Sequence, residues 1–297
     1  MKKKILFIVN PISGGRDKKK IPGLIDKHLD KNLFDYRISF TEKVEHGFML
    51  AKAAVKDQYQ IIVAVGGDGT VNEIAKAIIN SKILLGIIPF GSGNGLARCL
   101  NIPLTIEGAI VNINSLNFDT IDSASLNDHF FFNVAGSGFD AHISQSFAQN
   151  KIRGLTGYIR TTFRELRNYK SQEYKIYLDG QLYIRKAFIV SIANSSQYGN
   201  EAYIAPNADV KDGWLDVVIV KPIKWYKIPI LASRMFTKTA ESSKYVEILK
   251  AKKIYIEREF EAAIHLDGEP RIEQKNLSIE IIPLSINIIV PKNVKKK

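Results

Sequence analysis

The first third of the chain alternates short apolar runs with amphipathic segments. Four apolar runs predict strands, at residues 5–9, 36–40, 61–65 and 84–88. The segments that follow them predict helices, at about residues 18–30, 47–55, 71–80 and 95–100. This alternation is typical of a mostly parallel sheet with helices on both faces. We therefore expect an α/β domain, in which ligands bind at the carboxyl ends of the strands.

After about residue 122 the pattern changes to strands in which polar and apolar residues alternate. Within 173–185, Asp179-Gly180 separates two such runs and predicts a hairpin with a type I′ turn. Further runs predict strands at 214–220, 253–257, 264–266 and 277–282, and helices at 155–169 and 225–236. We expect an α/β domain of residues 1–122 with 285–297, to which the last apolar run returns, and a β-rich domain of residues 123–284.

Composition narrows the class of protein. The chain has 297 residues, of which 45% are hydrophobic, and its formal charge is 42 − 30 = +12, which favours anionic partners. The single Cys99 allows no internal disulfide, no signal peptide is apparent, and no apolar run reaches the roughly 18 to 20 residues that span a bilayer. A cytoplasmic protein is the simplest expectation.

Basic clusters offer two interpretations. Lysines 2–4, 18–20 and 295–297 are solvated surface on the simpler view, but they can also hold a protein against an anionic membrane. Apolar residues mixed with arginines over 147–164 can likewise form a basic amphipathic surface, although a core role is the more common one.

Glycine-rich stretches follow three of the predicted strands, at residues 10–15, 66–69 and 91–95. Glycine lets a backbone approach phosphate oxygens, and we expect Thr70 to start a helix whose N–H groups favour an anion. All three stretches should lie along one edge of the sheet. A bare Gly-Gly-Asp-Gly is more often a turn, but three such loops at successive strand ends indicate a phosphate site.

Asp68 changes the chemistry expected of that site. A carboxylate beside phosphates repels them unless it holds Mg²⁺ or acts on an acceptor hydroxyl, so it favours phosphoryl transfer over phosphate binding alone. The dinucleotide fingerprint, the P-loop and the protein-kinase signatures are absent from the sequence, and no nucleic-acid-binding motif is apparent.

Four motifs occur in order along nearly the whole chain: Asn10-Pro-x-Ser13-Gly14, Gly66-Gly-Asp-Gly-Thr70-Val-Asn72-Glu73, Gly91-Ser-Gly-Asn94 and Leu266-Asp267-Gly268-Glu269. Together they resemble the diacylglycerol kinase catalytic-domain family, soluble bacterial lipid kinases related to sphingosine and ceramide kinases. The resemblance implies a Rossmann-like α/β nucleotide-binding domain, a C-terminal β-sandwich, and transfer of the γ-phosphoryl group of ATP to a lipid hydroxyl in the cleft between them.

The resemblance also implies site residues. The ATP contacts would come from Asn10, Pro11, Ser13, Gly14, Thr41, Gly66, Gly67, Gly69, Thr70, Asn72, Glu73, Gly91, Ser92 and Asn94. The catalytic carboxylates would be Asp68, Asp267 and Glu269, with either of the last two as proton acceptor. Chemistry asks for the same parts, because a lipid hydroxyl needs a base and Mg²⁺ must neutralise the triphosphate. Taken alone, 267–269 is equally well a hairpin turn.

Two further sites follow from the resemblance. A structural Mg²⁺ would take the Asp212 side chain and the carbonyl groups of Asp209 and Trp214, although an Asx turn explains the same residues. Asp140, in Gly136-Ser-Gly-Phe-Asp140, would lie near the lipid head group, with capping of the following helix as the alternative.

These observations predict an ATP- and Mg²⁺-dependent lipid kinase, peripherally associated with an anionic membrane, that does not bind nucleic acid. Two alternatives stay open: an NAD kinase-like enzyme with a soluble acceptor, and a catalytically silent protein that binds anionic lipid. The acceptor lipid and the oligomeric state, a homodimer included, are left open by the sequence.

Overall fold

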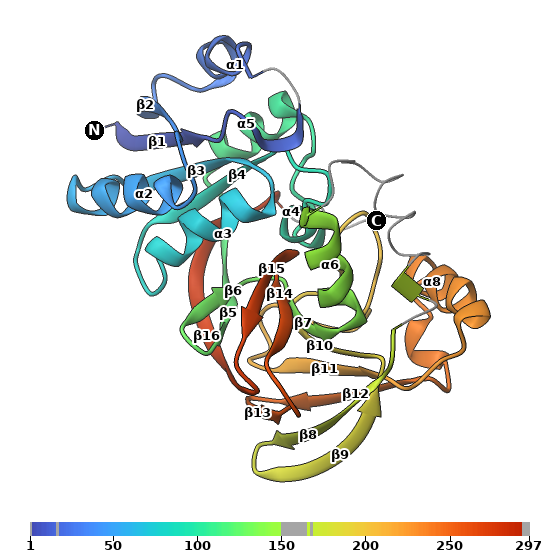
Figure 1. Cartoon of the computed structure of the whole chain (residues 1–297). Helices are drawn as coiled ribbons and strands as arrows, with labels where there is room; N and C mark the ends of the chain where they lie inside the picture. The colour runs from blue at the N-terminus through green and yellow to red at the C-terminus, as the bar shows by residue number, and fades with distance from the viewer. Residues whose placement is uncertain (1, 16–17, 150–164, 167–168, 293–297) are drawn as a thin grey trace. The chain divides into compact units, whose positions relative to one another are not determined.

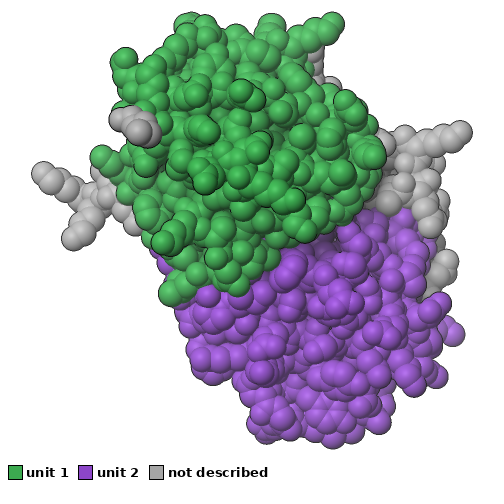
Figure 2. Space-filling view, turned by 90° about the vertical axis from the view of Figure 1, so that its left-hand side faces the viewer, with its two compact units in different colours: residues 1–121, 284–297 green, residues 122–283 purple. Residues whose placement is uncertain are grey.

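The computed structural model describes residues 2–15, 18–149, 165–166 and 169–292. The chain divides into two compact units, coloured separately in Figure 2. Unit 1 comprises residues 1–121 and 284–297, and unit 2 comprises residues 122–283. The helix expected at 155–169 and the basic amphipathic surface expected over 147–164 fall largely on residues 150–164, outside the described part of the chain.

Unit 1 is built on a parallel sheet with the strand order β2-β1-β3-β4-β16. The strands from the first third are β1 (Lys3–Val9), β2 (Phe34–Phe40), β3 (Ile61–Gly66) and β4 (Leu84–Pro89), which confirms the four predicted strands. In β3 every residue is buried, as expected of a central strand covered on both faces. The end of β16 (Asn276–Ile289) adds a fifth strand, with Asn287 and Ile288 beside Leu84 and Leu85.

Helices cover this sheet, as Figure 1 shows for the blue and green part of the chain. They are α1 (Ile21–His28), α2 (His46–Lys56), α3 (Asp68–Ala77), α4 (Gly95–Cys99) and α5 (Ile106–Asn114), with a short 3₁₀ turn, η1 (Ser13–Gly15). One helix boundary and one whole helix differ from expectation. Helix α3 begins at Asp68 rather than at Thr70, and α5 was not predicted, although Thr105 caps it by accepting the Gly108 N–H.

Unit 2 contains a six-stranded antiparallel sheet with the order β12-β11-β10-β7-β14-β15. These strands are β7 (Val134–Gly138), β10 (Ile189–Ala193), β11 (Leu215–Val220), β12 (Val246–Ala251), β14 (Ala262–Leu266) and β15 (Glu269–Glu273). A second group is formed by β8 (Gln172–Leu178), β9 (Gln181–Ala187), β13 (Lys253–Glu257) and the first half of β16. A short hairpin joins β5 (Phe118–Leu126) to β6 (His129–Phe131).

Strand β11 shows how unit 2 is layered. Val217 and Ile219 join the hydrophobic cluster that includes Ile176 and Ile254 of the second strand group. Their neighbours Val218 and Val220 point the other way, into a cluster with residues of the helices α6 (Phe139–Gln149) and α8 (Ile228–Phe236). Because both faces of β11 are covered, its sequence after Asp216 is continuously apolar rather than alternating.

Two predictions in unit 2 are refined. The hairpin at 173–185 is confirmed, with Asp179 at φ 47° and Gly180 at φ 92°, as a type I′ turn requires. The helix expected at 225–236 consists of a 3₁₀ turn, η2 (Trp225–Lys227), followed by α8, and a further 3₁₀ turn, η3 (Ala240–Ser242), comes after it. Within the described residues, no helix has the length and apolar character needed to cross a bilayer.

Candidate active site

The three glycine-rich stretches meet at the carboxyl edge of the parallel sheet in unit 1. Gly14 has φ 65°, and a Cβ there would lie 1.8 Å from the Phe90 carbonyl oxygen at the end of β4. A Cβ on Gly67 would lie 3.1 Å from the Cα of Gly91. The loops thus pack backbone against backbone, which only glycine permits. Main chain rather than side chains therefore forms the contacts between the loops along this edge.

The amino terminus of α3 opens onto the same edge. Thr70 packs on Gly66, where a Cβ would lie 2.4 Å from the Thr70 Oγ1, and its hydroxyl accepts a hydrogen bond from the Asn10 Nδ2 at 3.0 Å. Gly67 precedes the helix, and no side chain caps it. The first-turn N–H groups and the helix dipole therefore favour an anion.

Asp68 joins two of the loops. Its Oδ1 accepts the N–H of Gly95, the first residue of α4, at 2.8 Å. A Cβ on Gly93 would lie 3.0 Å from its Oδ2, so this oxygen is turned toward the loop that follows β4. The Asp68 carboxylate thus lies where the loop after β3 meets the loop after β4.

Asn94 shapes the loop that contains Gly91. Its Oδ1 accepts the Gly91 N–H at 2.8 Å, its Nδ2 donates to the Gly91 carbonyl at 2.8 Å, and its own φ is 49°. Arg98 adds a hydrogen bond from Nε to the Gly93 carbonyl. The Asn94 side chain is therefore engaged in fixing the turn.

Most of the remaining predicted nucleotide residues lie in these loops or in the first two turns of α3: Pro11, Ser13, Gly69, Asn72 and Ser92. Thr41 directly follows β2 at the same edge, and its N–H group is bonded to the Val9 carbonyl.

Glu73 has a different environment. Its carboxylate accepts the N–H groups of Glu45 and Gly47 at 2.9 and 3.0 Å and so anchors the start of α2. We therefore assign it a positioning role.

Lys18 is a loop residue that the sequence did not single out. It is buried, and its ammonium group donates to the carbonyls of Pro11 and Ser13, 3.2 Å from the former. Burial lowers its pKa below the usual value. The expectation that lysines 18–20 form a solvated or membrane-facing cluster is wrong for Lys18, because this side chain instead binds carbonyl groups of the 10–15 loop.

Replacing Lys18 by Met should loosen this loop. Two carbonyls lose their donor, so we expect the free energy of unfolding to fall by about 1 to 3 kcal/mol. Because the loop lies at the nucleotide edge, the apparent affinity for ATP should weaken as well. Denaturant unfolding and an ATP-binding titration measure both effects. Lys20→Met, at an exposed side chain two residues away, is the control; equal behaviour of the two variants would exclude the proposed support.

In unit 2, Asp267 and Gly268 form the two-residue turn between β14 and β15. Their φ angles are 50° and 88°, as in a type I′ turn, and Leu266 pairs with Glu269 across it. The Asp267 carboxylate accepts three backbone N–H groups, from Phe132, Asn133 and Val134, at 2.8 to 3.1 Å. Glu269 begins β15 and is exposed. The hairpin interpretation thus holds for the turn itself, and Glu269 is the carboxylate presented to solvent.

Arg258 holds the base of this hairpin, which the sequence did not reveal. It is buried, with one terminal nitrogen donating to the carbonyls of Ala262 and Ala263 and the other to those of Glu273 and Gln274. Both strand ends are thereby tied to one guanidinium. Burial lowers the pKa of Arg258.

Asp140 lies in the first turn of α6, as expected of a capping residue. Its Oδ1 accepts the Ala141 N–H at 2.8 Å. Its Oδ2 receives hydrogen bonds from Ser191 and Tyr198 and lies 3.1 Å from the His265 Nε2. The Ala141 contact is the one expected of capping, whereas the Oδ2 contacts tie α6 to β10 and to β14, two residues before the acidic turn. The role of Asp140 near a lipid head group stays a prediction.

The loop predicted to hold a structural Mg²⁺ has its oxygens engaged by protein donors. The Asp212 Oδ2 lies 2.6 Å from the Lys250 ammonium group, and its Oδ1 accepts the Trp214 N–H at 3.0 Å. Asp209 accepts the Lys211 N–H at 3.0 Å. Among the described residues, no cluster of three or more metal-ligating side chains is present. These contacts are those of the Asx-turn alternative, with a lysine that neutralises Asp212. The Mg²⁺ site, which would use one side chain and two carbonyl groups, stays a prediction.

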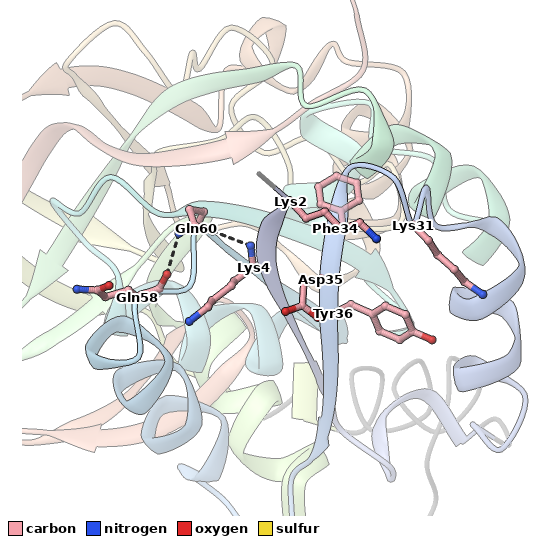
Figure 3. Close-up of a pocket in the computed structure, with 8 residues that line it drawn as sticks. All are labelled: Lys2, Lys4, Lys31, Phe34, Asp35, Tyr36, Gln58 and Gln60. Atoms are coloured by element: carbon pink, nitrogen blue, oxygen red, sulfur yellow. Dashed lines mark hydrogen bonds between the residues drawn. The ribbon is translucent and has the colours of Figure 1, made fainter.

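A pocket of about 780 Å³ lies elsewhere in unit 1 (Figure 3). Its lining includes Lys4, Phe34 and Gln60, which stand where β1, β2 and β3 begin. Gln60 accepts the Lys4 N–H and donates to the Gln58 carbonyl. Because the strands are parallel, this is the edge opposite the glycine loops, and the pocket is not part of the candidate site.

Comparisons with known proteins agree with this architecture. A model of the diacylglycerol kinase catalytic domain matches residues 4–126, and one of the YegS C-terminal NAD kinase beta sandwich-like domain matches residues 133–290. A diacylglycerol kinase of Staphylococcus aureus (strain MRSA252) is 28% identical over 280 residues, which cover 91% of this chain and 87% of that protein.

Solved structures extend the likeness to three dimensions. The crystal structure of a diacylglycerol kinase from Bacillus anthracis str. Sterne has a TM-score of 0.77 and 25% identity, with 98% of both chains covered. An NAD kinase from Archaeoglobus fulgidus, solved in complex with ATP, has a TM-score of 0.53 and 14% identity over 97% of this chain and 94% of its own. The latter likeness shows the fold alone.

These matches define the class of protein: a kinase that joins an N-terminal α/β domain to a C-terminal β-sandwich, as predicted. The chain belongs to the diacylglycerol kinase catalytic domain family. Membership implies that the protein is an enzyme that uses ATP.

Proposed function

We propose that this protein transfers the γ-phosphoryl group of ATP, bound as its Mg²⁺ complex, to the hydroxyl group of diacylglycerol or a related lipid at a membrane surface. The convergence of three glycine loops and an uncapped helix terminus on Asp68 supports this proposal most strongly. Phosphate binding alone does not need that carboxylate.

Each part of the site has a role in this reaction. The N–H groups around Gly14, Gly67 and the start of α3 would bind the phosphates. Asp68 would hold the accompanying Mg²⁺, which would neutralise charge on the phosphates. Glu269 accepts the proton of the lipid hydroxyl. As that oxygen bonds to the γ-phosphorus, the bond from this phosphorus to the β,γ-bridging oxygen breaks, and ADP leaves with the electron pair.

Asp267 and Arg258 support Glu269 without touching the reacting atoms. Three backbone N–H groups fix the Asp267 carboxylate, and the guanidinium of Arg258 fixes the two strand ends. A base must lie within hydrogen-bond reach of the proton that it removes, so a rigid hairpin serves it better than a mobile loop. The buried Asp140 network extends this support to α6.

The decisive experiment is phosphate transfer from γ-labelled ATP with Mg²⁺. Diacylglycerol, phosphatidylglycerol, a sphingoid base and ceramide are presented in mixed micelles, with NAD as a soluble acceptor. Label in one lipid supports the proposal and identifies the acceptor. Label in NAD alone overturns it in favour of the soluble-acceptor alternative, and binding of ATP and lipid without any transfer supports a silent lipid-binding protein.

A further inference from the structure

The segment 225–236 of unit 2, formed by η2 and α8, is apolar on two faces. One face packs on the core: Leu231 is buried there, with Ile228 and Met235 against the same cluster. The other face carries Trp225, Tyr226, Ile230 and Phe236, which are 55%, 51%, 62% and 59% exposed. We call these four residues the α8 face; α8 is drawn in orange in Figure 1.

The α8 face is continuous. At about 100° per residue, the exposed residues of α8 fall within an arc of about 120°: Pro229, Ile230, Ser233 and Phe236. The exposed residues Trp225 and Tyr226 of η2 directly precede them along the chain. The Trp225 and Tyr226 rings pack edge to face, with centroids 6.0 Å apart. A helix with apolar residues on both faces is normally buried on both, so we expect lipid or another molecule to cover the α8 face.

Positive charge surrounds the α8 face. From residue 217 to residue 240 the chain has no acidic residue and five basic ones, at 221, 224, 227, 234 and 238. Lys221 pairs with Glu247 at 3.4 Å, whereas the ammonium group of Lys224 lies over the Tyr226 ring, 5.9 Å from its centre.

The pKa of Tyr245 is affected by the same positive charges. Its hydroxyl accepts a hydrogen bond from Lys227 at 3.0 Å. That bond, together with the charges of Lys227, Lys244 and Lys224, lowers the pKa of Tyr245. The cations thus concentrate beside the apolar face, which is the pattern of a surface for an anionic partner.

We propose that the α8 face docks on the headgroup region of an anionic lipid bilayer. Tryptophan and tyrosine are the residues that prefer this region, and lysine and arginine at its rim attract acidic headgroups. A protein partner would not require that the segment with these exposed aromatic residues carry five basic residues and no acidic one. This inference rests on the proposed function and extends it, because it names the surface through which the enzyme would reach a lipid acceptor.

Vesicle binding tests the docking without reference to catalysis. The full chain is sedimented with phosphatidylcholine vesicles that contain or lack phosphatidylglycerol. Binding should require phosphatidylglycerol, and Trp225→Ser with Phe236→Ser should weaken partitioning by about tenfold or more, since two large apolar side chains lose their burial. Lys224→Gln with Arg234→Gln should weaken it too, and chiefly at low salt.

The matched control is Leu182→Ser with Ile184→Ser, two comparably exposed apolar side chains on β9 of the same unit. It should bind vesicles as the parent does. A second readout uses Trp225 itself: in a Trp214→Phe background it is the sole tryptophan, and its fluorescence should shift to the blue on anionic vesicles. No shift, or equal binding by the face and control variants, overturns the proposal.

Three further outcomes separate the hypotheses. Transfer to a short-chain diacylglycerol dispersed without a bilayer should be unchanged in the face variants. If the parent protein binds vesicles but phosphorylates no lipid, the proposed function is contradicted but the docking surface is not. If the face variants instead dissociate a dimer of the chain and bind vesicles normally, the face covers a second copy and the membrane proposal is wrong.

Discussion

Replacing Glu269 by Gln is expected to slow phosphoryl transfer to lipid by about 100- to 10,000-fold, the usual contribution of a general base. Glutamine keeps the shape of the exposed side chain at the start of β15 but cannot accept the hydroxyl proton. ATP binding and the free energy of unfolding should stay close to those of the parent, because unit 1 holds the nucleotide loops. The rate constant under saturating substrate, measured against pH, should lose its dependence on an acidic group.

Asp267→Asn gives the contrast that identifies the base. Asn places an NH₂ group against backbone N–H donors that the carboxylate now binds, so the free energy of unfolding should drop by about 2 to 3 kcal/mol. Glu261→Gln, an exposed carboxylate near the other end of β14, is the neutral control. Near-normal turnover of Glu269→Gln would falsify its role as base and leave Asp267 as the candidate.

Much of the fold could be predicted because its causes are local. The strands β1, β3 and β4 are short apolar runs followed by glycine-rich stretches, and the Asp179-Gly180 turn demands positive φ at both residues. Where the causes are not local, prediction failed. The runs 277–282 and 285–290 read as separate strands around Pro283, yet they form one strand, β16, with the irregularity at Leu284, whose φ is 45°.

The start of α3 shows how a motif can mislead at its boundary. Gly67-Asp68-Gly69 looks like the end of a turn because two glycines disfavour helix, so Thr70 was expected to begin it. Packing overrides this preference. Thr70 stands over Gly66 and is held by Asn10, which brings Asp68 and Gly69 into the helix. The amino terminus of the helix thereby shifts to the acidic residue itself.

Chemical type singles out candidate site residues in the sequence, but not the residues that support them. Asp68 and Glu269 stand out because carboxylates in glycine-rich turns are unusual, and Lys18 does not because it resembles its solvated neighbours. Its burial depends on carbonyls that only the folded 10–15 loop presents. Likewise, Arg258 gathers carbonyls from two strands of the hairpin. The contact of Lys250 with Asp212 in the 209–214 loop was missed for the same reason, since the two residues are 38 positions apart.

Asp68 can be tested with two substitutions that separate charge from shape. Asn keeps an oxygen that can accept the Gly95 N–H, so the junction between the two loops should survive. What it loses is the negative charge that faces the Mg²⁺ of the nucleotide complex. We expect the turnover number to fall by about 100- to 1,000-fold, as when one preorganised electrostatic contact is removed, with little change in the free energy of unfolding.

Asp68→Ala removes both properties. It should show the same kinetic loss plus a fall of about 1 kcal/mol in the free energy of unfolding, because the first N–H of α4 is left without its acceptor. Steady-state kinetics and denaturant unfolding measure the two effects, with the exposed Asp57→Asn as control. If Asn turns over normally and only Ala is impaired, Asp68 acts by joining the loops, and the charge in the proposed mechanism must come from another residue.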